Sequence, residues 1–119
     1  MSYIDGFVVP VPTDKREEYR AHCAEMAPLF QELGVTRMVE CWGDDVPDGK
    51  VTDFRRAVAA EPDESVVFAW LVWPSKAVRD AGMETMTSDP RKQPDRMPKI
   101  FDMKRMIFGG FTPLFDTEG

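Results

Sequence analysis

The stretch Val66-Val67-Phe68-Ala69-Trp70-Leu71-Val72-Trp73 decides the fold of this chain. Its residues are all apolar and rich in β-branched and aromatic types, and polar residues and a proline flank it. Such a short apolar run predicts a strand rather than a helix. Side chains alternate across a strand, so even-numbered residues share one face and odd-numbered residues the other. Because both sets are apolar, we expect this strand to be buried on both faces.

Length and composition narrow the class of protein. The 119 residues predict a single domain over 1–119, and the net charge of −6 disfavours nucleic acid as a partner. No apolar run approaches the roughly 20 residues that a membrane-spanning helix needs. No secretory signal is visible, which predicts a cytoplasmic protein with free thiols at Cys23 and Cys41. A disulfide between them is the minor alternative.

Hydrophobic periodicity and turn residues place the other elements around the apolar strand. In chain order they are a strand over 3–11, a helix from the N-cap Thr13 to the C-cap Gly34, a strand over 35–42, a helix from the cap Ser75 to about Met86, and a strand over 104–112. Residues 91–99 are expected to form a loop. Residues 51–59 fit a helical turn and an extended piece about equally well, and we expect irregular structure there.

The predicted order of elements, β-α-β-β-α-β, is that of the ferredoxin-like α+β fold: a four-stranded antiparallel sheet with two helices on one face. Two helices cover one face only, and the apolar strand has no polar face to offer to water. Burial of each large apolar side chain is worth roughly 1.5–3 kcal/mol. We therefore expect a homodimer whose sheets pack face to face. The sequence leaves open which strand face meets the helices.

Few residues carry the signature of a metal or cofactor site. His22 is the only histidine. It lies one residue off the apolar stripe predicted for the first helix, so we expect it to be solvated or at a boundary, with general base as the less favoured alternative. That stripe consists of Tyr19, Cys23, Met26, Phe30 and Leu33. One histidine and two separated cysteines predict no metal site, and no cofactor is expected. Cys41 fits a small core residue, and no recognisable base stands near either cysteine in the sequence. On the second helix, Lys76, Arg79 and Asp80 are expected on the solvated outer side.

Charged residues within the apolar strands are the more informative polar groups, because a buried charge must find a partner. These residues are Asp5, Arg37, Glu40 and Arg105. A cleft between sheet and helices, lined by aromatic and a few polar side chains, would suit a small molecule. The candidate bases are Glu40 and Asp53, and the candidate ligand-binding residues are Trp42, Arg55, Trp70, Trp73 and Arg105. The competing interpretation is a set of structural ion pairs with an aromatic core.

Several segments together resemble the YbaA-like family of small bacterial proteins, a domain of unknown function. They are residues 3–9, 39–42, 45–55, 74–76, 78–81, 88–91, 104–107 and 109–111, so the resemblance covers nearly the whole chain. It implies the dimeric α+β barrel superfamily. That superfamily includes cofactor-free monooxygenases, haem-dependent enzymes, muconolactone-isomerase-like proteins and stress proteins, so the resemblance does not select a reaction.

Two classes of function remain open from the sequence. The first is a homodimer that binds a small hydrophobic or aromatic molecule in the cleft between sheet and helices. The second is a cofactor-independent monooxygenase or isomerase, in which Glu40 or Asp53 is the base and Trp42 and Trp70 orient the substrate. A dimer without any small-molecule site is the third alternative.

Overall fold

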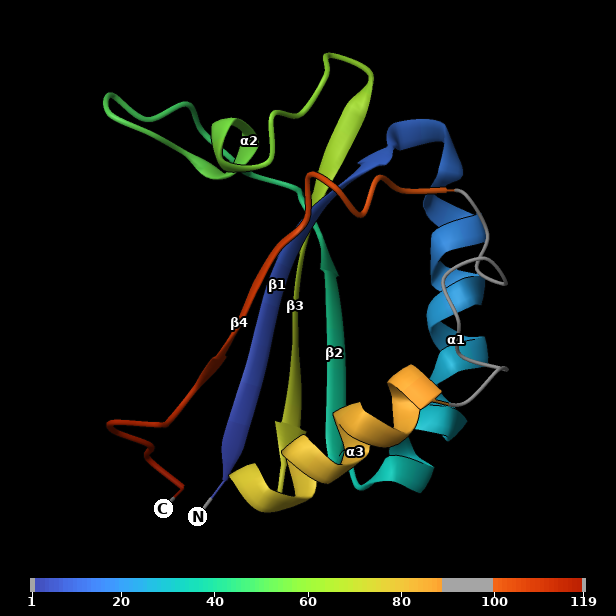
Figure 1. Cartoon of the computed structure of the whole chain (residues 1–119). Coiled ribbons are helices and arrows are strands. Elements are labelled where there is room, and N and C mark those ends of the chain that lie inside the picture. The colour runs from blue at the N-terminus through green and yellow to red at the C-terminus, as the bar shows by residue number, and fades with distance from the viewer. Residues whose placement is uncertain (1, 89–99, 119) are drawn as a thin grey trace.

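The computed structural model describes residues 2–88 and 100–118 and confirms the predicted ferredoxin-like order of elements (Figure 1). The elements are β1 (Tyr3–Pro12), the 3-10 turn η1 (Thr13–Lys15), α1 (Arg16–Leu33), β2 (Arg37–Trp42), α2 (Phe54–Ala57), β3 (Glu64–Trp73), α3 (Lys76–Ser88) and β4 (Ile107–Phe111). The last strand is shorter than predicted. The loop predicted over 91–99 lies outside the described residues.

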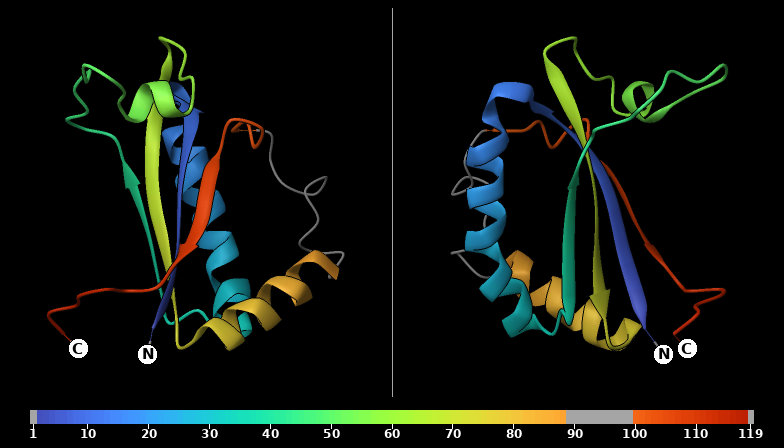
Figure 2. Two further views of the ribbon diagram at one scale, coloured as in Figure 1. Left: turned by 60° about the vertical axis from the view of Figure 1, so that its left-hand side comes forward. Right: turned by 180° about the vertical axis from the view of Figure 1, so that it is seen from behind.

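The four strands form one antiparallel sheet in the order β2-β3-β1-β4. The apolar stretch that decides the fold lies in β3, which pairs with β1 along its whole length, from Tyr3 opposite Trp73 to Pro12 opposite Glu64. Both long helices, α1 and α3, cover the same face of the sheet (Figures 1 and 2). We call this the helix face, and the other the open face.

Exposure along β3 settles which side of the strand meets the helices. Val67, Leu71 and Trp73 are 1%, 4% and 0% exposed, whereas Phe68 is 45% exposed. The odd-numbered side chains therefore form the helix face. The even-numbered side chains, Trp70 among them, lie on the open face. Only the packing of α1 and α3 makes this distinction, because both sets are equally apolar.

Local signals at the helix ends are partly confirmed. Gly34 is the C-cap of α1 with φ 118°, and its N–H donates to the carbonyl of Gln31. The Ser75 Oγ accepts the N–H of Val78, which confirms the predicted cap of α3. The prediction of Thr13 as the N-cap of α1 is wrong. Thr13 lies in η1, and its hydroxyl pairs at 2.8 Å with that of Ser65, so α1 begins only at Arg16.

The segment 51–59 was expected to be irregular, and the structure corrects this with a one-turn helix, α2. The Asp53 carboxylate accepts the N–H of Arg56 and so caps that turn. The helix packs over the end of the open face, where Val58 is 1% exposed and forms a small core with Val8 and Val66. Side-chain capping by an aspartate thus favours the helical turn over the extended alternative.

The remainder of the open face is uncovered by any described element. Ile107 on β4 is 45% exposed, and Phe111 at the end of that strand is 61% exposed. The ring of Phe68 contacts those of Phe54 and Trp70, with centroids 5.9 and 5.7 Å away. The chain therefore presents a contiguous apolar surface there, of the kind that marks an interface.

Candidate functional site

A glutamate and a tyrosine meet between the sheet and the first long helix. Glu40 on β2 lies opposite Ala69 of β3 and shares its helix face. Tyr19 of α1 is 5% exposed, and its hydroxyl donates to Glu40 Oε1 at 2.8 Å. The apolar stripe of α1 turns Tyr19 towards the sheet, and strand alternation turns Glu40 towards the helix. This pair is the centre of the candidate site.

Burial dominates the electrostatics of this pair. It raises the pKa of Glu40, although hydrogen bonds from Tyr19 and Cys23 favour the ionised form and oppose the rise. Burial, reinforced by the nearby Glu40 carboxylate, also raises the pKa of Cys23 to about 12 and raises that of Tyr19. The site therefore holds a carboxyl group that gains a proton more readily than an exposed glutamate does.

Aromatic side chains surround the pair. The ring of Tyr19 lies 6.5 Å from that of Trp42 and 5.7 Å from that of Phe101, and the guanidinium of Arg16 lies 6.0 Å over Trp42. Trp42 and Phe101 are only partly buried, so the cluster reaches the surface. We call Tyr19, Cys23, Glu40, Trp42 and Phe101 the Glu40 cluster.

His22 lies beside the Glu40 cluster, and the expectation that it would be solvated or at a boundary is wrong. It is 9% exposed, and its ring lies 6.0 Å from that of Phe101. The helix presents one more residue to the interior than the apolar stripe indicated, because the segment that contains Phe101 also covers this side of α1. Burial lowers the pKa of His22, which favours the neutral imidazole.

The Glu40→Gln variant tests the electrostatics of the cluster. The folded-state pKa of Glu40 lies above its unfolded value, so the folded protein binds more protons in the window above the unfolded pKa. Wild-type stability therefore falls as the pH rises through that window, and the variant lacks this loss. We expect urea unfolding between about pH 4 and 8 to show the variant gaining stability relative to wild type with rising pH.

Glu64→Gln is the matched control with the opposite sign. Hydrogen bonds from Arg105 hold the pKa of Glu64 below its usual range, so the stability from this group is present at neutral pH and lost on acidification. The loss of folding stability in Glu64→Gln relative to wild type should therefore shrink as the pH falls. A Glu40→Gln profile parallel to that of wild type would contradict the assigned burial of Glu40.

The two cysteines are expected to differ in reactivity. The thiolate is the nucleophile, and burial raises the pKa of Cys23 to about 12, so its thiol stays protonated at pH 7. Cys41 lies opposite Phe68 and therefore on the open face. At a protein concentration below the dimer Kd, where the open face is uncovered, mass spectrometry after brief iodoacetamide treatment should find Cys41 alkylated and Cys23 spared, and both alkylated in denaturing urea. Equal rates in the folded protein would contradict this assignment.

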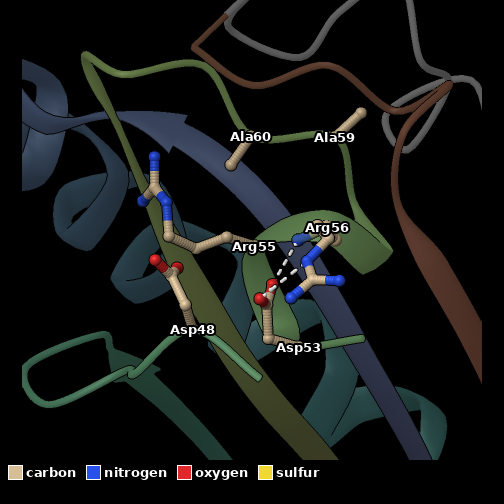
Figure 3. A pocket seen from close by; sticks show the side chains of 6 residues that line it. All are labelled: Asp48, Asp53, Arg55, Arg56, Ala59 and Ala60. Carbon is tan, nitrogen blue, oxygen red and sulfur yellow. Dashed lines mark hydrogen bonds and ion pairs between the residues drawn. The ribbon is translucent and has the colours of Figure 1, made fainter. Parts of the chain in front are cut away.

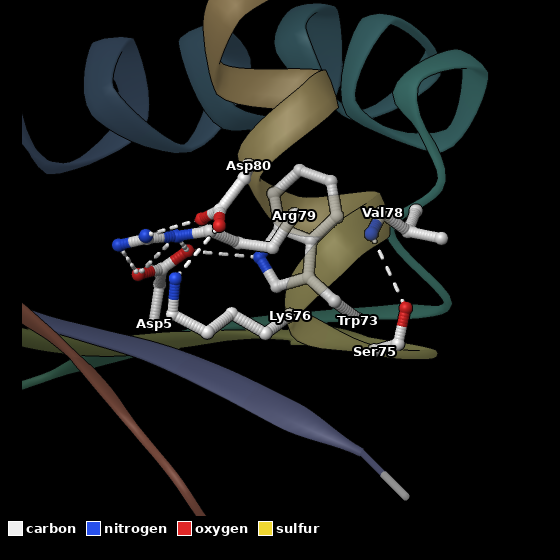
Figure 4. A network of polar contacts seen from close by, with 7 residues as sticks. All are labelled: Asp5, Trp73, Ser75, Lys76, Val78, Arg79 and Asp80. Atoms are coloured by element: carbon white, nitrogen blue, oxygen red, sulfur yellow. Dashed lines mark hydrogen bonds and ion pairs between the residues drawn. The ribbon is translucent and has the colours of Figure 1, made fainter.

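Trp73, one of the predicted ligand-binding residues, lies in the core at the other end of the helix face. Its indole N–H donates to Asp5 Oδ2 at 2.9 Å, and Asp5 also pairs with Arg79 through two guanidinium nitrogens (Figure 4). Arg79 was expected on the solvated side of its helix, and this is wrong. Lys76 and Asp80 form an exposed pair there at 2.7 Å, and Arg79 also reaches Asp80 at 3.0 Å.

The remaining predicted residues do not join the Glu40 cluster. Asp53 and Arg55 lie on the α2 segment, which packs on the open face (Figure 2), and Trp70 is on that face too. Arg105 pairs with Glu64 at 2.7 Å. The two candidate bases therefore lie on opposite faces of the sheet. Hydrogen bonds from backbone N–H groups lower the pKa of Asp53. Its side chain therefore favours the ionised form, which caps α2.

A hollow of about 410 Å³ lies on the α2 segment (Figure 3). Its lining residues are Asp48, Asp53, Arg55, Arg56, Ala59 and Ala60. The guanidinium of Arg55 donates to the carbonyls of Glu61 and Glu64, and that of Arg56 to Asp53. These contacts hold the loop together. Within the described ranges, no group of three or more histidine, cysteine or acidic side chains is placed to hold a metal ion.

Two polar contacts were not predicted from the sequence: that of Tyr19 in the candidate site and that of Arg79 with the core residue Asp5. Tyr19 was assigned to the apolar stripe, and that position is correct, but its hydroxyl needed an acceptor. Asp5, a lone carboxylate in a strand, was expected to need a partner. The sequence offered several cations and no rule for choosing Arg79 among them.

The family model described as a protein of unknown function, DUF1428, matches residues 2–103. The chain belongs to the DUF1428 family. Relatives in this family include the uncharacterized protein YbaA of Escherichia coli strain K12 and that of Shigella flexneri. Each is 58% identical over 116 residues, which cover 98% of this chain and 99% of the relative. The predicted resemblance to the YbaA-like family is thereby confirmed.

Solved structures of low sequence identity share the fold of this chain. A mutant of SnoaB, a cofactor-independent oxygenase from Streptomyces nogalater, superposes with a TM-score of 0.62 at 14% identity, covering 99% of this chain and 98% of SnoaB. A dimeric ferredoxin-like protein from an uncultured marine organism gives 0.55 at 9% identity, over 93% and 92% of the two chains. At these identities the likeness concerns the fold alone. None of the described helices is long and apolar enough to cross a membrane.

Proposed function

We propose that this DUF1428 protein is a cytoplasmic homodimer that binds a small hydrophobic or aromatic molecule at the Glu40 cluster. The observation that carries the proposal is the partly buried Glu40 carboxyl group, held by Tyr19 and bordered by partly buried aromatic rings. A mostly apolar surface with a few convergent polar groups is the usual character of a small-molecule site.

The chemistry of the cluster favours a ligand that carries a hydroxyl group on an aromatic or extended apolar body. The Glu40 carboxylate has only the side chains of Tyr19 and Cys23 as partners among the described residues and retains capacity to accept from a ligand hydroxyl. The rings of Trp42 and Phe101 offer flat apolar surface for the body of such a ligand. Phenols and enols combine these two properties.

The open face supports the dimeric part of the proposal. Its exposed aromatic side chains, with Phe68 at 45% and Phe111 at 61%, would be buried by a second copy of the sheet. The fold likeness to a protein described as a dimeric ferredoxin-like protein is consistent with this assembly.

The raised pKa of Glu40 favours a second candidate, a cofactor-independent oxygenase or isomerase. A partly buried carboxylate is a stronger base than an exposed one, and Glu40 would take the proton of a phenol or enol to leave a bound anion. Trp42 would orient the ring. The likeness to SnoaB adds the precedent of a cofactor-independent oxygenase on this fold.

Binding is tested by titrating phenols, naphthols and hydroxyquinones, with tryptophan fluorescence and native mass spectrometry as readouts. We expect a mass of two chains with one ligand each, and quenching that is lost in Trp42→Phe. Trp70→Phe is the matched control, because Trp70 lies on the opposite face of the sheet. Saturable binding unaffected by Trp42→Phe would place the ligand elsewhere and refute the proposed site.

Glu40→Gln separates the two candidate functions. In a binding protein, the variant keeps a hydrogen-bond acceptor and is expected to bind neutral ligands with at most a modest loss of affinity. In an enzyme, the variant loses the base, and turnover of the same ligands under air should fall by about 100-fold or more. Binding without turnover in wild type would exclude the enzyme candidate for the ligands tested.

A further inference from the structure

A segment without helix or strand lies over the Glu40 cluster. We call residues 100–106 the strap, and Figure 1 shows it crossing from the side of α1 to β4. Ile100 is 7% exposed and belongs to the same core as Tyr19. The ring of Phe101 lies edge-on to that of Tyr19 at 5.7 Å, and 6.0 Å from the ring of His22. The strap thus covers the tyrosine that holds Glu40.

The strap occupies the surface that a ligand ring needs at the cluster. Tyr19 is only 5% exposed, and its ring pairs with those of Trp42 and Phe101. A ligand therefore reaches the Tyr19 ring only when one of these two side chains gives way. Trp42 belongs to a strand paired with β3, whereas Phe101 belongs to a segment outside the sheet. The strap is thus the part that moves without breaking a strand pairing.

Backbone hydrogen bonds hold the strap only weakly. Among the described residues, its backbone–backbone bonds are two turn contacts inside the strap itself: the N–H of Arg105 donates to the carbonyl of Asp102, and that of Met106 to that of Met103. A segment with few backbone hydrogen bonds to its surroundings opens locally at a lower free energy than the whole domain unfolds. Opening of the strap therefore leaves the sheet and both long helices intact.

One arginine makes all the hydrogen bonds and ion pairs between the strap and the rest of the described chain. Arg105 donates through two guanidinium nitrogens to the Glu64 carboxylate, at 2.7 Å each, and also to the carbonyl of Ala59 at 2.9 Å. The Glu64 side chain is 9% exposed, so water competes less for this two-pronged pair than for a surface pair. Ala59 has φ 49°, in the left-handed region that alanine seldom adopts. Such a backbone is typical of functional contacts.

We propose that the strap opens and closes over the Glu40 cluster, with the pair of Arg105 and Glu64 as its latch. Opening moves Phe101 away from Tyr19 and admits the ligand, and closing returns the ring onto the apolar body of the ligand. Both latch residues lie outside the cluster, so Arg105 is a positioning residue that acts through Phe101. This inference rests on the ligand site proposed above and goes beyond it by naming the part that controls access.

His22 is the probe for opening, because it is the only histidine of the chain, is 9% exposed and lies beside Phe101. Diethylpyrocarbonate acylates an accessible neutral imidazole, and mass spectrometry of protein without a histidine tag measures the rate. Arg105→Met removes the latch and keeps a long side chain, so we expect the His22 rate to rise by about tenfold or more. Arg105→Lys keeps the charge without the two-pronged contact and should give an intermediate rate.

Arg79→Ala is the matched control, because it breaks a partly buried ion pair at the other end of the helix face and lowers the stability of the whole domain. Its His22 rate should stay close to that of wild type under native conditions. An equal rise in Arg79→Ala and Arg105→Met would show that global unfolding exposes His22, which would overturn the inference. An unchanged rate in an Arg105→Met protein with a native circular dichroism spectrum would also overturn it.

The His22 measurement needs no ligand, so it separates this inference from the proposed function. If no phenol or naphthol binds, the ligand site is refuted, while a faster His22 rate in Arg105→Met still supports the opening of the strap. If 1-naphthol binds, stopped-flow tryptophan fluorescence should show both association and dissociation rate constants rising in Arg105→Met by about tenfold. Unchanged rate constants would overturn the inference and leave the ligand site standing.

Discussion

Replacing Arg79 with alanine is expected to lower the free energy of unfolding by about 3 kcal/mol, the lower end of the cost of leaving one partner of a buried ion pair alone, because the Arg79 side chain is 23% exposed. Asp5 is 8% exposed, and its carboxylate accepts from the guanidinium of Arg79 at 2.8 and 3.0 Å. The Trp73 indole N–H remains after the substitution, but it brings no positive charge. The measurement is urea unfolding followed by circular dichroism at neutral pH.

Lys76→Ala is the matched control, because it removes a cation from the same helix whose partner, Asp80, is exposed. Its unfolding midpoint should stay close to that of wild type. The double variant Asp5→Asn/Arg79→Met should recover part of the loss, since it removes the unpaired charge and keeps an acceptor for Trp73. An Arg79→Ala midpoint equal to that of Lys76→Ala would show that the buried pair contributes little.

Phe68→Asp is expected to raise the dimer Kd by about 100-fold or more. Each dimer loses two buried phenylalanine side chains, each worth roughly 1.5–3 kcal/mol, and a factor of ten in Kd corresponds to about 1.4 kcal/mol. The new carboxylates would also face an apolar partner surface. Sedimentation velocity over a dilution series measures the Kd, and circular dichroism checks that the monomer stays folded.

Phe108→Asp provides the control for a charge placed on the same sheet. Phe108 on β4 lies opposite Phe7, on the helix face, and is 80% exposed. Phe108 lies outside the proposed interface, so the dimer Kd of Phe108→Asp should match that of wild type. Equal weakening by both substitutions, or none by Phe68→Asp, would refute the open face as the dimer interface.

The sequence predicted the elements best where short-range rules apply. Gly34 is a C-cap in the left-handed conformation, and Ser75 accepts the N–H of the residue three positions later. Both are local features that were predicted from the sequence, and both are confirmed. Thr13 met the same local rule, but its hydroxyl pairs with Ser65, far away in the sequence. A competing tertiary contact can therefore displace a cap that propensity alone favours.

The candidate site could be predicted only in part. Glu40 and Trp42 were predicted to line one cleft, and the structure places both in the cluster, because residues two apart in a strand share a face. Asp53 and Arg55 follow in sequence, but the chain crosses to the other side of the sheet between Trp42 and α2. No local pattern encodes that crossing.

The sequence by itself determined the order of the elements and the need to bury a strand that is apolar on both faces, because periodicity and turn chemistry act over a few residues. Only the tertiary structure decided which of these faces the helices cover, since burial is worth the same for either set of side chains. It also decided that Asp5 pairs with Arg79 and Glu40 with Tyr19. Such partners lie far apart along the chain, and the packing of helix on sheet selects them.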